Sequence, residues 1–124
     1  MEIVIGATGS ADLVVRGEDT AIALGSGDVP VLGTPRLVAL LEEAAVAALA
    51  GDLADGITSV GTHMTVDHQA ASRVGAEVSG FAEVVSVEGR TVVFRLVARE
   101  GGRTVAIGNH TRVLVDRERF LASR

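Results

Sequence analysis

The longest apolar stretch of the chain spans residues 35–50, and it predicts a helix that is buried on nearly every side. Its apolar positions leave almost no polar face, which is typical of a helix that packs inside a protein. Thr34 is a suitable N-cap, Pro35 suits the first helical position and Gly51 is a plausible C-cap. Such a helix would carry the carboxylate of Glu42 in its middle.

Alternation of apolar and polar residues predicts strands over most of the remaining chain. The expected strands are 13–15, 20–24, 57–68, 75–87, 91–99 and 104–115, with turns at 17–19, 52–56, 87–90 and 100–103 and a flexible loop at 25–30. One buried helix followed by a run of antiparallel strands predicts an α+β fold in which a sheet wraps around the helix. No repeat or low-complexity linker interrupts the pattern, so we expect one domain over residues 1–124.

Composition narrows the chemistry that is available. The 124 residues include no Cys, Trp, Tyr or Lys, which excludes thiol nucleophiles, disulfides, Schiff-base lysines and thiolate metal sites. Any catalysis therefore depends on Ser, Thr, His, Asp, Glu or Arg. The separations of His63, His68 and His110 match no usual zinc spacing, and no phosphate-binding glycine motif is present, so we expect no metal and no nucleotide.

Charge and hydropathy bear on partners and location. A net charge of −5 and three phenylalanines as the only aromatic residues disfavour nucleic acid, which requires a basic and usually stacking surface. The start of the sequence has no basic leader and no stretch is long enough to span a membrane, so we expect a cytoplasmic protein with no membrane partner. The mean hydropathy of +0.40 is high for a small monomer and favours a homo-oligomer.

Three local patterns carry a resemblance to a known family. Glu42 follows Thr34 by eight residues on the predicted helix; the strand 61–68, which reads GTHMTVDH, is followed by Ala-Ala-Ser at 70–72 and Gly75; and a late strand at 108–112 reads GNHTR. The chain resembles hotdog-fold thioesterases, and more narrowly the family typified by fluoroacetyl-CoA thioesterase. The resemblance implies an acyl-CoA hydrolase that acts as a dimer without a cofactor.

The same resemblance assigns roles to five residues. It places Thr34, Glu42 and His68 in catalytic positions and Gly61 and Arg112 in supporting positions that bind substrate. The typical enzyme has aromatic residues in the loop before its threonine, whereas residues 25–28 here read GSGD. Selectivity for a fluorinated acyl group is therefore not carried over.

The chemistry of the side chains alone allows more than one role for Glu42 and for His68. Glu42 lies among leucines and alanines, where burial would make it a stronger base; it would activate water or attack the carbonyl directly. The alternative is a solvated glutamate, because Glu43 follows it about 100° around the helix. His68 could polarise the nucleophile or protonate the leaving sulfur. Asp67 and His63 should point to the face opposite His68, so neither is expected to orient its ring.

Helix geometry shapes the expected site. Thr34 and Glu42 are separated by about 12 Å along a helix, so they should not touch the same atom, and a site shared across a dimer is expected. Thr34 is equally explained as a helix cap. Gly61 could offer its N–H to an oxyanion or mark a bulge, and Arg112 is read most simply, from sequence alone, as a surface arginine.

Two other functions remain open. An enoyl-CoA hydratase or dehydratase of this fold would place an Asp and a His a few residues apart, whereas Asp67 and His68 are adjacent. A non-catalytic acyl-CoA-binding protein is the other alternative, because one fold hosts many functions. The sequence leaves open the acyl group and whether dimers join into a tetramer.

Overall fold

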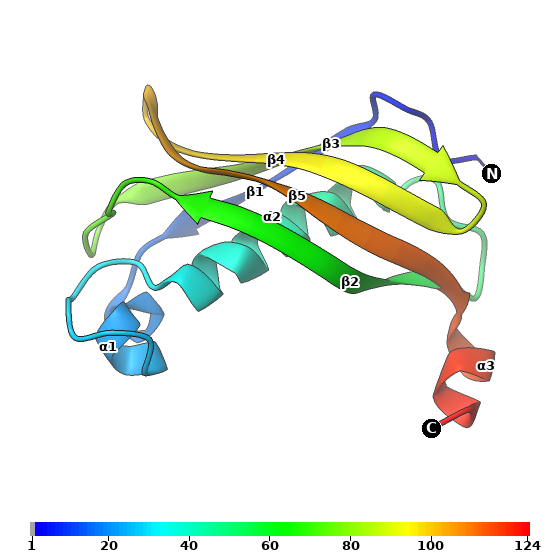
Figure 1. Cartoon of the computed structure of the whole chain (residues 1–124), viewed down its shortest axis with the longest axis horizontal. Coiled ribbons are helices and arrows are strands. Elements are labelled where there is room, and N and C mark those ends of the chain that lie inside the picture. The colour runs from blue at the N-terminus through cyan, green and yellow to red at the C-terminus, as the bar shows by residue number, and fades with distance from the viewer. Residues whose placement is uncertain (1) are drawn as a thin grey trace.

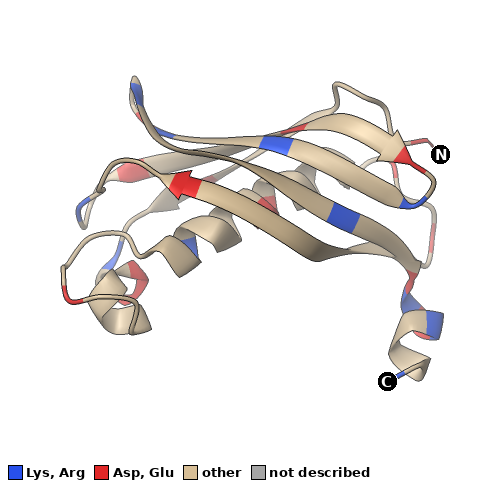
Figure 2. Cartoon of the chain, in the orientation of Figure 1, with Lys and Arg blue, Asp and Glu red and all other residues tan. Residues whose placement is uncertain are grey.

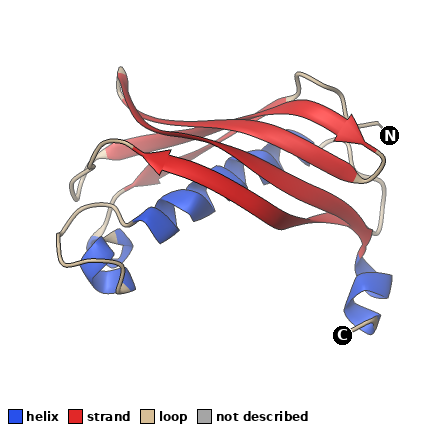
Figure 3. Cartoon of the chain, in the orientation of Figure 1, coloured by secondary structure: helices blue, strands red, loops and turns tan. Residues whose placement is uncertain are grey.

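A single long helix lies along the concave face of a curved sheet, as Figures 1 and 3 show. The computed structural model describes residues 2–124. In chain order the elements are β1 (Thr8–Val14), the 3-10 helix η1 (Gly17–Asp19), α1 (Ala21–Leu24), α2 (Thr34–Leu49), β2 (Ile57–His68), β3 (Glu77–Glu88), β4 (Thr91–Glu100), β5 (Arg103–Asp116) and α3 (Arg117–Ala122). The predicted α+β fold, with one helix wrapped by an antiparallel sheet, is confirmed.

The helix α2 occupies the predicted stretch, but its ends differ in detail from the prediction. Gly33 is the N-cap and Thr34 is the first helical residue, so the prediction that Thr34 caps the helix is wrong. The C-cap is Ala50 rather than Gly51. The helix buries seven of its residues, yet Val46 remains 48% exposed. One side of α2 is therefore uncovered in a single chain, contrary to the expectation of burial all round.

The five strands form one antiparallel sheet in the order β1-β3-β4-β5-β2. The prediction for β2 agrees with its observed bounds, and those for β3, β4 and β5 differ by one or two residues at their ends. Both β1 and β2 are edge strands. The free edge of β2 is twelve residues long, and an exposed strand edge offers unpaired backbone groups to another chain.

Residues 20–24 were predicted as a strand, and that prediction is wrong. The Thr20 hydroxyl accepts a hydrogen bond from the Ala23 backbone N–H, which starts the short helix α1. Gly25 ends it in the left-handed conformation, with φ of 72°. Local capping thus outweighs the weak strand pattern of five mostly small apolar residues.

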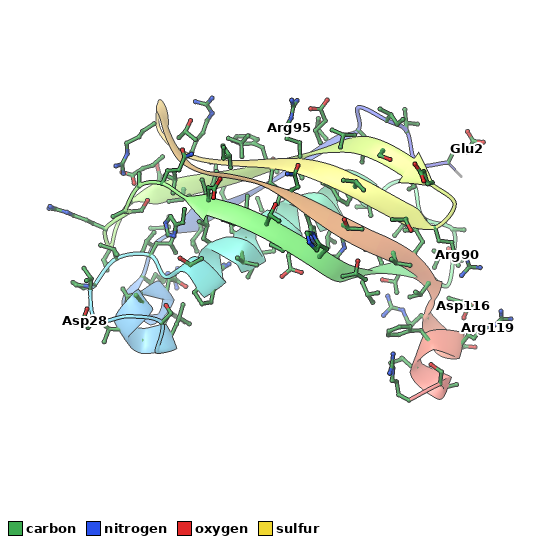
Figure 4. The ribbon with its side chains drawn as sticks, in the orientation of Figure 1. Glu2, Asp28, Arg90, Arg95, Asp116 and Arg119 are labelled. Atoms are coloured by element: carbon green, nitrogen blue, oxygen red, sulfur yellow. The ribbon has the colours of Figure 1, made fainter. Side chains whose placement is uncertain are left out.

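The core lies between α2 and the inner face of the sheet, where α2 packs mainly against β1 and β3. Close approach of β1 depends on Gly9, because a Cβ there would lie 2.3 Å from the Ala48 nitrogen and 2.4 Å from the Ala44 carbonyl oxygen. On the opposite face of the sheet, side chains such as Arg95 project away from the helix (Figure 4). The inner face of the sheet is therefore the one that can share a site with α2.

The strand β2 contains a bulge close to its middle. Its pairing with β5 shifts register between Gly61 and His63, which leaves Thr62 as the extra residue. Beyond the bulge Met64, Val66 and His68 are partly buried, whereas the residues between them are exposed. His63 and Asp67 consequently lie on the face opposite His68, as predicted.

In the view of Figure 2, positions of positive and negative residues are interspersed along the sheet and the helices. Among residues 2–124, no helix is both long enough and apolar enough to cross a membrane.

Candidate active site

The first polar group of the inner face joins the start of α2 to the end of β2. Oγ1 of Thr34 lies 2.8 Å from Nδ1 of His68, within hydrogen-bond distance. The start of α2 lies below the last residues of β2 in the view of Figure 1. Two side chains that are 34 positions apart therefore meet here. The hydroxyl is engaged with an imidazole rather than with the helix end.

His68 is held in a partly buried setting. Burial lowers the pKa of His68 from its ordinary value, and an interaction with the backbone of Ala70 partly offsets this effect. Its Nε2 atom is buried and makes no hydrogen bond of ordinary geometry with the described residues. The ring is therefore favoured in its neutral form, in which one nitrogen can accept a proton.

A groove of about 350 Å³ opens beside this pair. One wall is the loop before α2, including Ser26 and Gly27, and the other is the segment after β2, including Ala70 and Ala71. Asp28 lies on that loop, away from the sheet (Figure 4). None of the described residues that line the groove is Phe, Tyr or Trp, in agreement with the sequence of the loop.

The second polar group gathers around Arg112 on β5. Arg112 is only 7% exposed, so the simple reading of it as a surface arginine is wrong. Its Nε donates to the Ser59 hydroxyl at 2.8 Å and its Nη2 donates to the Ser59 carbonyl at 3.1 Å. Its Nη1 lies 3.5 Å from Oε2 of Glu42 and 3.1 Å from Nε2 of His110. The guanidinium is thus anchored on one side and faces a carboxylate on the other.

Glu42 points from α2 toward Arg112, while Glu43 points outward and pairs with Arg36 at 2.9 Å. This division matches the expectation that one of the two glutamates faces in. The Glu42 side chain is still 41% exposed, so the burial that was expected for it is not met in a single chain. Because the Arg112 contact engages Oε2, Oε1 is the oxygen left for water or substrate.

Gly61 provides the space in which this group meets. A Cβ at Gly61 would lie 2.9 Å from Oε2 of Glu42, 3.1 Å from Cε1 of His110 and 3.3 Å from Nη1 of Arg112. Gly61 is also the β2 residue that pairs with Arg112 across the sheet, next to the bulge. The sequence reading of this glycine as part of a bulge is therefore met, while the role of its N–H toward an oxyanion stays a prediction.

Two members of the second group, Ser59 and His110, were missed as site residues by sequence reasoning. His110 lies in the GNHTR pattern and was weighed as a metal ligand but given no role in the site, yet it is 1% exposed and bonded to the arginine. Alternation along β5 was the available signal, because it places His110 and Arg112 on the same inner face.

The structure divides the five predicted site residues into two sets. Thr34 and His68 form one, and Glu42, Gly61 and Arg112 form the other. No hydrogen bond joins the two sets among residues 2–124, and the helix rise separates Thr34 from Glu42 by about 12 Å. Within the described chain, no group of three or more His, Asp or Glu side chains could hold a metal ion.

Comparisons with known proteins add to this geometry. The model of a family described as fluoroacetyl-CoA-specific thioesterase matches residues 15–118. The fluoroacetyl-CoA thioesterase of Streptantibioticus cattleyicolor is 39% identical over 92 residues; the alignment covers 74% of this chain and just under two thirds, 66%, of that protein.

Solved structures show the same likeness. A mutant of the fluoroacetyl-CoA-specific thioesterase in complex with fluoroacetate and CoA is 34% identical, with a TM-score of 0.86 over 94% of this chain and 98% of that one. A hot-dog-like protein from Thermanaerovibrio acidaminovorans is 25% identical, with a TM-score of 0.87 over 96% of this chain and 88% of the other. These matches confirm the resemblance and the hotdog fold predicted from the sequence.

Proposed function

Because the chain belongs to the family of fluoroacetyl-CoA-specific thioesterases, we propose that it hydrolyses a small acyl-CoA thioester to the free acid and CoA. The observation that carries the proposal is the 2.8 Å contact between the Thr34 hydroxyl and the His68 imidazole beside an open groove. A half-exposed carboxylate, Glu42, lies on the same inner side of the sheet and supplies the remaining group that thioester hydrolysis needs.

The reaction makes modest demands on the protein. A thiol of pKa about 8.5 leaves readily, so the site must mainly supply a nucleophile and stabilise the oxyanion. We assign the first task to Glu42, which either activates a water molecule or attacks the carbonyl carbon through its free Oε1. Arg112 holds the other oxygen and so fixes the direction in which the carboxylate points.

The Thr34–His68 pair is assigned to the oxygen and sulfur of the thioester. A neutral imidazole bonded to a hydroxyl can orient that hydroxyl toward a carbonyl oxygen, and once it has taken up the proton released by the attacking water it can deliver that proton to the leaving thiolate. The lowered pKa of His68 supports this assignment, because it keeps the ring neutral at the start of the reaction. Selectivity for fluoroacetyl is not part of the proposal, since none of the described residues that line the groove is Phe, Tyr or Trp.

We further propose that the active site is completed in a homodimer. The distance of about 12 Å along α2 keeps Thr34 and Glu42 of one chain apart, whereas two chains can bring Glu42 of one to the Thr34–His68 pair of the other. The exposed edge of β2 and the exposed Val46 on α2 support self-association on this side. Joining of two dimers into a tetramer and the cytoplasmic location stay predictions.

Release of free thiol from a panel of short, branched and aryl acyl-CoAs tests the activity. We expect hydrolysis of at least one member, and a loss of about 10²- to 10⁴-fold in kcat for Glu42→Gln. Glu43→Gln is the matched control, because Glu43 is its exposed neighbour and pairs with Arg36. Absence of hydrolysis throughout the panel, or full activity of Glu42→Gln, contradicts the proposal; saturable acyl-CoA binding without turnover would indicate a binding protein.

Mixing two inactive variants tests the shared site. Refolding Glu42→Gln together with His68→Gln would give mixed dimers in which one site receives both intact residues, and random pairing restores roughly one quarter of wild-type activity. A site contained within each chain would remain inactive in every mixture. Sedimentation of the wild-type protein distinguishes the monomer, the dimer and the tetramer.

A further inference from the structure

The imidazole of His110 is buried at the centre of the second polar group, where the proposed reaction gives it no task. It is 1% exposed and stacks on Phe94, with ring centroids 6.0 Å apart. Phe94 on β4, Arg112 on β5 and the backbone of His63 on β2 lie against it, so the ring is almost completely shielded from solvent. Each of its two nitrogens has one polar partner within the protein, and those partners define its tautomer.

The hydrogen-bond partners leave one consistent arrangement of protons. Nδ1 lies 2.8 Å from the carbonyl oxygen of His63, and a carbonyl can only accept, so Nδ1 carries the hydrogen. In the neutral ring Nε2 is then an acceptor, and it receives a hydrogen from Nη1 of Arg112 at 3.1 Å. Burial lowers the pKa of His110, which agrees with this neutral form.

The acceptor at Nε2 of His110 determines the orientation of the Arg112 guanidinium. Ser59 takes one hydrogen from Nε and one from Nη2 of Arg112. His110 takes one of the two hydrogens on Nη1, which leaves the other directed at Oε2 of Glu42. Without the acceptor at Nε2, one hydrogen on the buried Nη1 would have no partner. The free-energy cost of that unpaired hydrogen would favour another orientation of the Arg112 guanidinium.

We propose that His110 is a positioning residue which, as the neutral Nδ1–H tautomer, holds Nη1 of Arg112 against Glu42 and thereby sets the direction of the Glu42 carboxylate for hydrolysis. The inference rests on the proposed function and deepens it by naming a residue that acts through Arg112. His110 contacts no substrate atom in this scheme.

Protonation of His110 would remove the hydrogen-bond acceptor that Nε2 offers to Arg112. Both ring nitrogens would then be donors, and Nε2–H would meet Nη1–H of a cation. The titratable groups near the ring are Arg112 on its own strand, Glu42 on α2 and, from the other face of β2, His63, while Phe94 on β4 is uncharged. Arg112 and His63 oppose the charged ring and Glu42 favours it, so an acidic medium weakens the Arg112–Glu42 alignment.

Two variants that should be destabilised to a similar extent distinguish a positioning role of His110 from a purely structural one. His110→Gln places an amide oxygen near the former Nε2 and keeps the acceptor for Arg112, while it loses the donor to His63. His110→Asn places an amide N–H near the former Nδ1 and keeps that donor, while it loses the acceptor. Both variants lose the stack on Phe94 and one buried hydrogen bond, so urea unfolding should show similar stabilities.

Steady-state kinetics on the best acyl-CoA of the panel give the decisive contrast. We expect His110→Gln to keep about a third of the wild-type kcat and His110→Asn to lose about 10- to 100-fold, with little change of KM in either, because misdirection of a reacting group reduces the chemical step. Equal losses in both variants, or the better activity in His110→Asn, would overturn the inference while the loss in Glu42→Gln still upheld the thioesterase.

A spectroscopic measurement determines the tautomer of His110 directly and does not require enzymatic activity. Nitrogen-15 chemical shifts of the His110 ring at neutral pH should show a protonated Nδ1 and a bare Nε2, and Arg112→Lys should perturb the Nε2 signal. A protonated Nε2 would overturn the inference whatever the activity. If the wild-type protein hydrolysed no acyl-CoA, the proposed function and the catalytic part of the inference would fail together, and the ring shifts would still report the geometry.

Discussion

Substitution of Gly61 by alanine tests whether the placement of Glu42 matters more than its presence. The added Cβ would lie 2.9 Å from Oε2 of Glu42, closer than the ordinary contact range that begins at 3.4 Å. Cε1 of His110 and Nη1 of Arg112, at 3.1 and 3.3 Å, must give by about 0.1 to 0.3 Å, and the carboxylate must retreat by about 0.5 Å. It is the far end of a flexible and half-exposed side chain, so it yields more easily than the backbone of β2.

A shift of this size has a larger effect on the rate than on the fold. Misplacement by 1 Å costs about 10²-fold in rate, so about 0.5 Å should reduce kcat by about 10-fold. The free energy of unfolding should change by less than about 1 kcal/mol, because alanine in a strand loses less chain entropy than glycine and offsets the crowding.

Acyl-CoA hydrolysis and urea unfolding, measured on the same preparation, check this pair of results. Gly102→Ala is the control, since a Cβ there meets nothing within 4 Å and the backbone has no positive φ. Wild-type kcat in Gly61→Ala would refute the reasoning, and so would a loss of activity that merely followed a loss of several kcal/mol in stability.

Two further predictions concern stability. Gly108→Ala should reduce the free energy of unfolding by about 2 to 3 kcal/mol, because its Cβ would lie 2.0 Å from the Thr65 carbonyl oxygen; an unchanged urea midpoint would contradict this. Burial lowers the pKa values of His68 and His110 below 6.5, so the unfolded chain binds more protons as the pH falls below about 6.5. The urea midpoint should therefore be lower at about pH 5 than at pH 7, and less so in His110→Gln; an equal or higher midpoint at the lower pH would count against the assignment.

Much of the fold could be predicted because the hydrophobic patterns of its main elements are continuous in the sequence and extend over many residues. The apolar stretch that begins after Thr34, with Pro35 near its start, has one interpretation as a helix, and alternation marks β2 with equal clarity. The segment around Thr20 is different: five residues cannot distinguish a strand from a helical turn, and a single hydroxyl bonded to the Ala23 N–H decided the outcome.

Candidate site residues could be proposed from the sequence, but their contacts could not. Sequence spacing and the family resemblance pointed to Thr34, His68 and Arg112 as candidates, yet sequence alone favoured a helix cap for the first and a surface position for the last. Both readings fail because the partners of these side chains come from distant strands. The Thr34 partner lies 34 positions away, and Arg112 meets Ser59 at a separation of 53. Contacts between side chains so far apart in the sequence cannot be predicted from a local sequence pattern.

The bulge in β2 explains how both halves of the site come to face α2. Gly61 and His68 are seven residues apart, so in a regular strand their side-chain directions would point to opposite faces of the sheet. The extra residue at Thr62 changes the alternation by one position. The position of a Cβ on Gly61 therefore faces Glu42 while His68 reaches Thr34, both on the inner side. The bulge thus lets the two polar groups share one face of the sheet, which a regular strand would not allow.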